Sequence, residues 1–219
     1  MPNPTCRARR YNVFKHYITL IVRSRAGCYL DVPPPPLNGP PCWCYTPVNT
    51  EKICRVTMML HKVTVERNSL KFAAAHFATF CGDCEPLHGH NYAVMVQVTG
   101  ELTDDSWVVD FSELKRTTRR YCDELDHKFI LQMKSHVLTI TERSEEYEIR
   151  FSESQRYVFP RQDVYPLPAD NSTAERIAEW LAGKLREELL PRWPNLTNIT
   201  VGVEEAPGQA GWYSEDIEC

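Results

Sequence analysis

The sequence predicts an α+β fold from the order of its strand-like and helix-like segments. Two runs in which apolar residues alternate with polar ones, 61–77 and 92–102, come first. Two amphipathic helical patterns follow, beginning near Asp110 and Ser172, and two short strand patterns come last. The order strand, strand, helix, helix, strand, strand indicates one domain of ordinary size, and a chain of 219 residues is long enough for its core.

Residues 1–57 differ in composition from the rest of the chain. They hold five of the nine cysteines, nine of the sixteen prolines, and eight Lys or Arg against two acidic residues. The run 33–36 consists of four prolines, which excludes a helix and favours polyproline II. We expect a poorly ordered N-terminal extension, or a non-native one if translation starts at Met58 or Met59, followed by a domain over 58–219.

Charge and hydropathy exclude several classes of partner. The net charge is −4 and the pI about 6.0, so no basic surface predicts nucleic-acid binding. No apolar run reaches membrane-spanning length, and no secretion signal is evident. The odd number of cysteines, nine, then favours reduced thiols in a cytoplasmic protein.

Three of the seven histidines lie within fifteen residues, around the loop 80–88. His88 and His90 are two residues apart, so they point to the same face of a strand, and His76 ends the preceding predicted strand. Three imidazoles with an open fourth position are typical of catalytic zinc. Cys84, four residues before His88, is a candidate proton carrier, because a cation beside a thiol lowers its pKa.

The first helix is predicted to begin after Asp110 as N-cap, with Glu113 three residues on. Its expected buried face comprises Phe111, Leu114, Thr118, Tyr121, Cys122 and Leu125.

The second helix is predicted to open with a capping box, Ser172 to Glu175, and to stop at Pro191. Strands are then expected at 198–204 and 211–214. The expected core face of this helix is Ile177, Leu181, Leu185 and Leu189.

Between the helices, residues 137–165 predict an extra hairpin or lid-like insertion. Strand patterns occur at 137–140, 147–151 and 157–159. The residues of this segment suggest no chemistry, so we expect a surface elaboration.

Taken together, Ala-Ala-His76 and Cys84-x3-His88-Gly-His90-Asn resemble the 6-pyruvoyltetrahydropterin synthase family, and within it the 6-carboxytetrahydropterin synthases. The resemblance covers about residues 60–215, interrupted by 137–165. Three further segments resemble family motifs: Leu-Asp126-His127, Ser-Thr-Ala-Glu-Arg at 172–176, and Glu205-Ala-Pro. In the last two, Ser172, Arg176 and Ala206 stand where Pro, Asn and Thr are usual.

This resemblance implies a tunnelling fold. In that fold an antiparallel sheet carries two helices on one face, and the sheets of several subunits join into a barrel. A homohexamer is the implied assembly, with active sites between subunits.

The resemblance also implies a reaction and a site. The implied enzyme is a lyase acting on 7,8-dihydroneopterin triphosphate to give 6-carboxy-5,6,7,8-tetrahydropterin, a precursor of 7-deazapurines such as queuosine. The resemblance implies Zn²⁺ on His76, His88 and His90, which would acidify the substrate hydroxyls. It further implies Cys84 as general acid or base, Asp126 and His127 as a proton-transfer pair, and Glu205 as the carboxylate that accepts two N–H bonds from the pterin.

The sequence leaves the product open because Glu85 follows Cys84. The chain therefore also contains Glu-x2-His-Gly-His, which resembles a branch that forms 6-hydroxymethyl-7,8-dihydropterin for folate. A 6-pyruvoyltetrahydropterin product, a Cys81–Cys84 redox pair, and a zinc- and pterin-binding protein without turnover are also compatible with the sequence.

Overall fold

The computed structural model describes residues 60–153 and 155–217. The expectation for residues 1–57 lies outside this part of the chain. The elements are β1 (His61–His76), β2 (Thr79–Phe80), β3 (Asp83–Cys84), β4 (His88–Gly100), α1 (Phe111–Leu125), β5 (Lys128–Gln132), β6 (Thr139–Glu142), β7 (Glu146–Phe151), β8 (Gln155–Pro160), a 3₁₀ turn (Arg161–Asp163), β9 (Val164–Leu167), α2 (Ala174–Leu189), β10 (Leu196–Ala206) and β11 (Gln209–Asp216).

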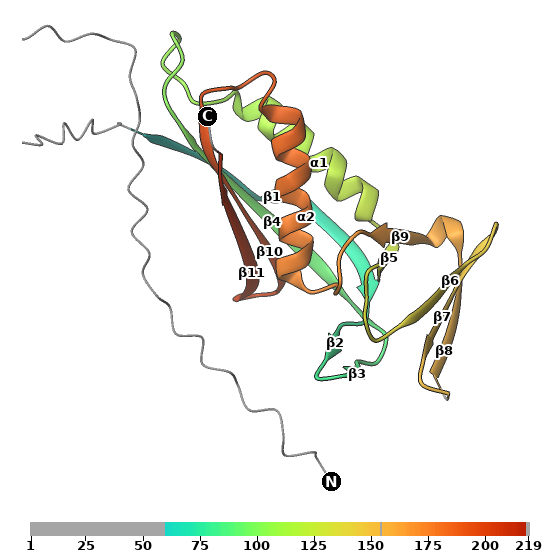
Figure 1. Cartoon of the computed structure of the whole chain (residues 1–219). Helices are drawn as coiled ribbons and strands as arrows, with labels where there is room; N and C mark the ends of the chain where they lie inside the picture. The colour runs from blue at the N-terminus through green and yellow to red at the C-terminus, as the bar shows by residue number, and fades with distance from the viewer. Residues whose placement is uncertain (1–59, 154, 218–219) are drawn as a thin grey trace, which may run out of the picture. The chain divides into compact units, whose positions relative to one another are not determined.

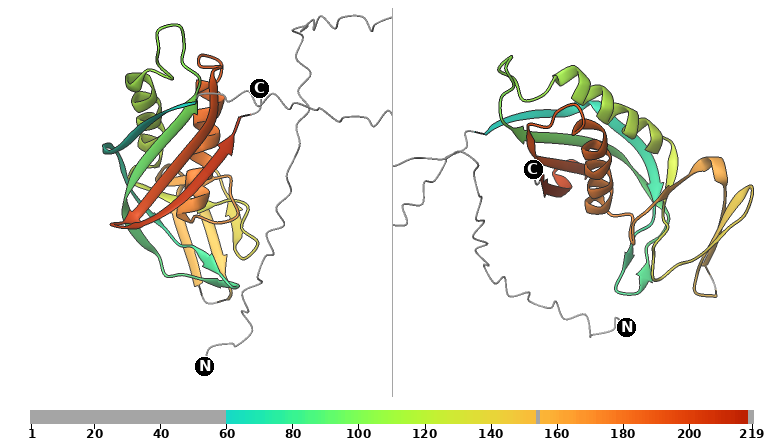
Figure 2. Two further views of the ribbon diagram at one scale, coloured as in Figure 1. Left: turned by 90° about the vertical axis from the view of Figure 1, so that its left-hand side faces the viewer. Right: turned by 45° about the horizontal axis from the view of Figure 1, so that its top comes forward.

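One six-stranded sheet, in the order β11-β10-β4-β1-β5-β9, forms the centre of the domain. The α+β class is confirmed, and both helices cover the same face of the sheet (Figures 1 and 2). The strands from β11 to β1 are antiparallel, as expected, whereas β5 and β9 add to β1 in parallel. The sheet is therefore mixed. The sequence did not predict β5 and β9, because they are strands of four or five residues whose apolar runs show no alternation.

The core lies between this sheet and the helices. Alternate residues of β4 from Tyr92 to Val98 and the face Ile177, Leu181, Leu185 and Leu189 of α2 are buried, as expected from the sequence. On α1, Leu114, Thr118, Cys122 and Leu125 are buried and Tyr121 partly so, but Phe111, the first residue of the helix, is exposed.

Strand β1 is continuous, but its pairing with β4 shifts register between Glu66 and Lys71. The predicted capping box at Ser172 is wrong: Thr173 occupies the N-cap of α2 without a side-chain hydrogen bond. The Ser172 hydroxyl instead donates to the carbonyl of Phe77 in the core.

The segment predicted as an insertion forms a separate three-stranded antiparallel sheet, β6-β7-β8. Its aromatic face packs on the end of the main sheet: Phe159 stacks on Phe129 at 4.4 Å and Tyr157 on Phe77 at 5.3 Å between ring centroids. The insertion therefore contacts the residue that directly follows His76.

None of the helices in the described part of the chain combines the length and apolarity needed to cross a membrane.

Candidate metal centre and pocket

The three predicted ligands meet where β1 ends and β4 begins. His76 pairs with His88, and Ala74 pairs with His90, so the antiparallel register brings the imidazoles together. Gly89 allows this close approach, since a Cβ there would lie 2.9 Å from the Ala74 carbonyl oxygen. The potential ligand atoms of the three rings all lie within 4.8 Å of one another.

Backbone carbonyls orient two of these rings. His76 Nδ1 donates to the Ser172 carbonyl at 2.8 Å, and His88 Nδ1 donates to the Pro86 carbonyl at 2.8 Å. Their Nε2 atoms therefore face each other, 3.1 Å apart. A hydrogen bond from the distal ring nitrogen to a carbonyl is the usual support of a metal-bound histidine.

The donor set fits zinc. Two nitrogens bound to tetrahedral Zn²⁺ at 2.0–2.1 Å lie roughly 3.4 Å apart, close to the separation of the His76 and His88 Nε2 atoms. Burial, partly opposed by the Ser172 carbonyl, lowers the pKa of His76 to about 4. The ring is consequently neutral at physiological pH, which is the form that binds a metal.

A cavity of about 460 Å³ opens over the three histidines. Glu85 and Glu205 line it, and the first turn of α2, Thr173 to Glu175, forms one wall. Glu205 is half-buried, and this burial raises the pKa of its carboxyl group. One cavity thus combines a potential metal site with carboxylates.

Cys84 does not line this cavity. Its side chain packs against the apolar cluster around Phe77 and Phe129, and its thiol contacts the Glu85 carbonyl at 3.5 Å. Burial and the Glu85 carboxylate raise the pKa of the thiol. The charged group that acts on this thiol is thus an anion, Glu85, and the expected role of Cys84 as a proton carrier stays a prediction.

Asp126 and His127 follow α1. The Asp126 carboxylate accepts the Ala73 N–H at 2.7 Å and pairs with His127 Nδ1 at 3.0 Å, and these contacts lower the pKa of the carboxyl group. His127 is largely exposed and lines a different cavity, of about 540 Å³, which shares His90 with the first. Within one copy of the chain, Asp126 and His127 do not line the cavity over the three histidines.

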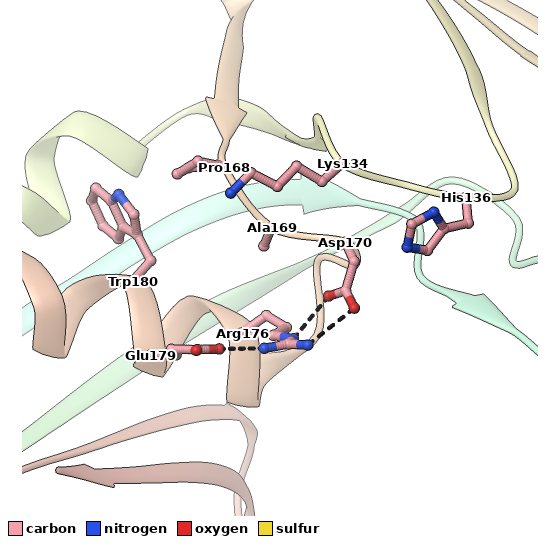
Figure 3. Close-up of a pocket in the computed structure, with 8 residues that line it drawn as sticks. All are labelled: Lys134, His136, Pro168, Ala169, Asp170, Arg176, Glu179 and Trp180. Atoms are coloured by element: carbon pink, nitrogen blue, oxygen red, sulfur yellow. Dashed lines mark hydrogen bonds and ion pairs between the residues drawn. The ribbon is translucent and has the colours of Figure 1, made fainter.

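The Ser172 carbonyl that orients His76 and the neighbouring Asn171 side chain were not among the predicted site residues. Their roles depend on contacts across 90 or more residues, so no local pattern signals them. Asp170, directly before them, lines a third cavity, of about 420 Å³, where Arg176 pairs with Asp170 and Glu179 while Lys134 and His136 lie opposite (Figure 3).

Comparison with known proteins shows the family to which the chain is similar. Residues 63–216 match the family model described as 6-pyruvoyl tetrahydropterin synthase. A protein of Methanocaldococcus jannaschii named "Putative 6-carboxy-5,6,7,8-tetrahydropterin synthase" is 34% identical over 151 residues, 68% of this chain and 92% of that protein. One of the same name from Pyrococcus horikoshii is 30% identical over 141 residues, 63% and 81% of the two chains.

Solved structures agree as well. The 6-pyruvoyl tetrahydropterin synthase of Plasmodium vivax has a TM-score of 0.69 and 36% identity, covering 73% of this chain and all of that one. Two further structures of that protein, each 35% identical with a TM-score of 0.69 and the same coverage, replace a glutamate described as a catalytic residue. Because the family model spans most of the described residues, and the histidines that the family resemblance singled out meet in space, the chain belongs to the 6-pyruvoyl tetrahydropterin synthase family.

Proposed function

We propose that the chain is a zinc-dependent lyase that converts 7,8-dihydroneopterin triphosphate into 6-carboxy-5,6,7,8-tetrahydropterin, on the route to 7-deazapurines, as a cytoplasmic homohexamer. The observation that carries the proposal is the convergence of three imidazoles on one cavity that also contains Glu85 and Glu205. The names of the archaeal relatives support the product.

Each residue of the cavity has a separate role in this proposal. Zinc held by His76, His88 and His90 would acidify the side-chain hydroxyls of the substrate. Glu205 anchors the pterin, because a carboxylate accepts two N–H bonds from a 2-amino-4-oxo pyrimidine edge. Glu85 or its neighbour Cys84 moves the proton, and the Asp126–His127 pair supplies a second proton-transfer group.

A specific observation favours a second product, 6-hydroxymethyl-7,8-dihydropterin. Glu85 lines the histidine cavity, whereas the Cys84 thiol packs into an apolar cluster with a raised pKa. A catalytic glutamate is also described for the Plasmodium vivax relative. For this second product, Glu85 is the general base and Cys84 a packing residue.

Product analysis tests both assignments. Zinc-loaded protein is incubated with 7,8-dihydroneopterin triphosphate, and the pterins formed by the wild type, Cys84→Ala and Glu85→Ala are identified by mass spectrometry. A 6-carboxy product that disappears in Cys84→Ala supports the main proposal, and a 6-hydroxymethyl product that disappears in Glu85→Ala supports the second. Zinc and pterin binding without any product would indicate a binding protein and contradict both.

A further inference from the structure

Two consecutive residues before α2 connect the histidines to the hairpin that carries the candidate acid–base groups. Asn171 uses its side-chain amide twice on one residue: Oδ1 accepts the Thr79 N–H at 3.0 Å and Nδ2 donates to the Thr79 carbonyl at 2.9 Å. A neighbouring strand makes the same pair of bonds in an antiparallel sheet. Asn171 therefore replaces a missing strand beside β2.

This replacement has a consequence for Cys84 and Glu85. Strands β2 and β3 are two residues long, and a ladder this short does not persist by itself. Thr79 pairs with Cys84, and the Glu85 N–H donates to the Ala78 carbonyl at 2.9 Å. Fixing Thr79 thus fixes where residues 84 and 85 lie.

Ser172, the second residue of the pair, contacts the metal-site histidine His76. It is fully buried, its carbonyl accepts His76 Nδ1 at 2.8 Å, and its hydroxyl donates to the Phe77 carbonyl at 3.0 Å. The Ser172 N–H in turn donates to Asn171 Oδ1 at 3.0 Å, and Gln132 Nε2 donates to the same oxygen at 3.4 Å. One dipeptide therefore holds both the His76 ring and the hairpin.

The dipeptide Asn171–Ser172 is also restrained through the residue that precedes it, Asp170. Arg176, in the first turns of α2, pairs with both carboxylate oxygens of Asp170, at 2.8 and 3.0 Å (Figure 3). This bidentate contact restrains the backbone directly before Asn171.

We propose that Asn171 is a positioning residue that sets the place of Glu85 and Cys84 relative to the three histidines. The inference rests on the proposed function, since it assigns a role within that reaction. It predicts that loss of the Asn171 amide loosens the hairpin and slows the chemical step while the metal stays bound, because the three imidazoles and the Ser172 carbonyl remain in place.

Three measurements on the full chain test this role in Asn171→Ala: hydrogen exchange of the peptide spanning 77–87, zinc affinity by chelator competition, and steady-state kinetics. Exchange in this peptide should accelerate at least about tenfold. The kcat should fall about 10- to 100-fold, with zinc affinity within roughly threefold of the wild type. Asn171→Asp keeps the acceptor and loses the donor, so its exchange rate should be intermediate.

Asn195→Ala is the matched control. The Asn195 amide also bridges backbone groups, donating to the carbonyls of Glu101 and Val108 at 2.7 and 2.9 Å, but at the other end of β4. This variant should leave exchange of peptide 77–87 and kcat unchanged.

Unchanged exchange in Asn171→Ala, or an equal acceleration in Asn195→Ala, would overturn the inference. So would a loss of zinc affinity as large as the loss of kcat, because Asn171 would then support the metal site instead of the hairpin. If the wild type forms no pterin product, the proposed function fails, whereas hydrogen exchange still decides whether Asn171 holds the hairpin.

Discussion

At the residue scale, Glu205 should govern affinity for the pterin. Hydrogen bonds to a charged group contribute about 1.5–3 kcal/mol, so Glu205→Gln should raise KM roughly 10- to 100-fold with a much smaller change in kcat. Glu204→Gln is the control, since the Glu204 carboxylate accepts the Gly208 N–H in the adjacent turn. Equal KM values for the two variants would remove Glu205 from the binding site.

The same residue predicts a pH dependence. Burial raises the pKa of the Glu205 carboxyl group, so it takes up a proton at a higher pH than an ordinary glutamate. The neutral acid cannot accept two N–H bonds. The KM of the wild type should therefore rise on the acid side toward that of Glu205→Gln, whose own KM should be flat over this range; parallel KM profiles for the two proteins would contradict this account.

At the element scale, Glu148 on β7 should hold the inserted sheet together. Its nearly buried carboxylate accepts from Arg143, Arg150 and Arg156 at 2.6–2.9 Å. The hydrogen bonds from Arg156 and then Arg150 lower the pKa of the Glu148 carboxyl group to about 2. Because this pKa is below the unfolded value, the stabilisation is complete above about pH 4.5 and is lost as the pH falls toward 2.

Glu148→Gln should therefore lower the urea midpoint most at neutral pH, and its difference from the wild type should shrink as the pH falls from about 4.5 toward 2. Glu153→Gln, an exposed position in the turn after β7, should match the wild type throughout. A difference for Glu148→Gln that is constant with pH would mean that packing, and not the charge, is responsible.

The elements also show where sequence reasoning succeeds. Period-two alternation in β4 places Tyr92, Val94, Val96 and Val98 in the core under the helices, and the i, i+4 spacing of α2 reflects its buried face, so both were predictable. The meeting of the three histidines was also predictable, because His88 and His90 lie two residues apart on one strand and His76 ends the preceding strand. The parallel strands β5 and β9, the role of Ser172 in the core, and the Asn171 bridge depend on contacts between distant segments, and a local pattern such as Ser-x-x-Glu even predicted the wrong cap.

At the scale of the whole molecule, the proposed site is divided. The histidines, Glu85 and Glu205 line one cavity, whereas His127 lines another. Strands β11 and β9 form the two edges of the sheet, and Trp212 on β11 is half-exposed. Edge strands with unpaired backbone groups are the usual places where sheets of separate copies join. We therefore expect His127 of one copy to complete the histidine cavity of a neighbouring copy.

Complementation between inactive variants tests this division. His88→Ala removes a proposed metal ligand and His127→Ala removes the proposed proton-transfer group, so each homo-oligomer should be inactive. In co-expressed mixtures, a site built from the cavity of a His127→Ala copy and the His127 of a His88→Ala copy is intact. If copies assemble at random, roughly a quarter of the sites should recover, because each of the two contributing copies is the right one half the time.

A mixture of His88→Ala with His76→Ala should recover nothing, since both changes affect the same cavity. Absence of recovery in the first mixture, with mixed oligomers verified by mass, would place His127 and the histidines of one site in the same copy.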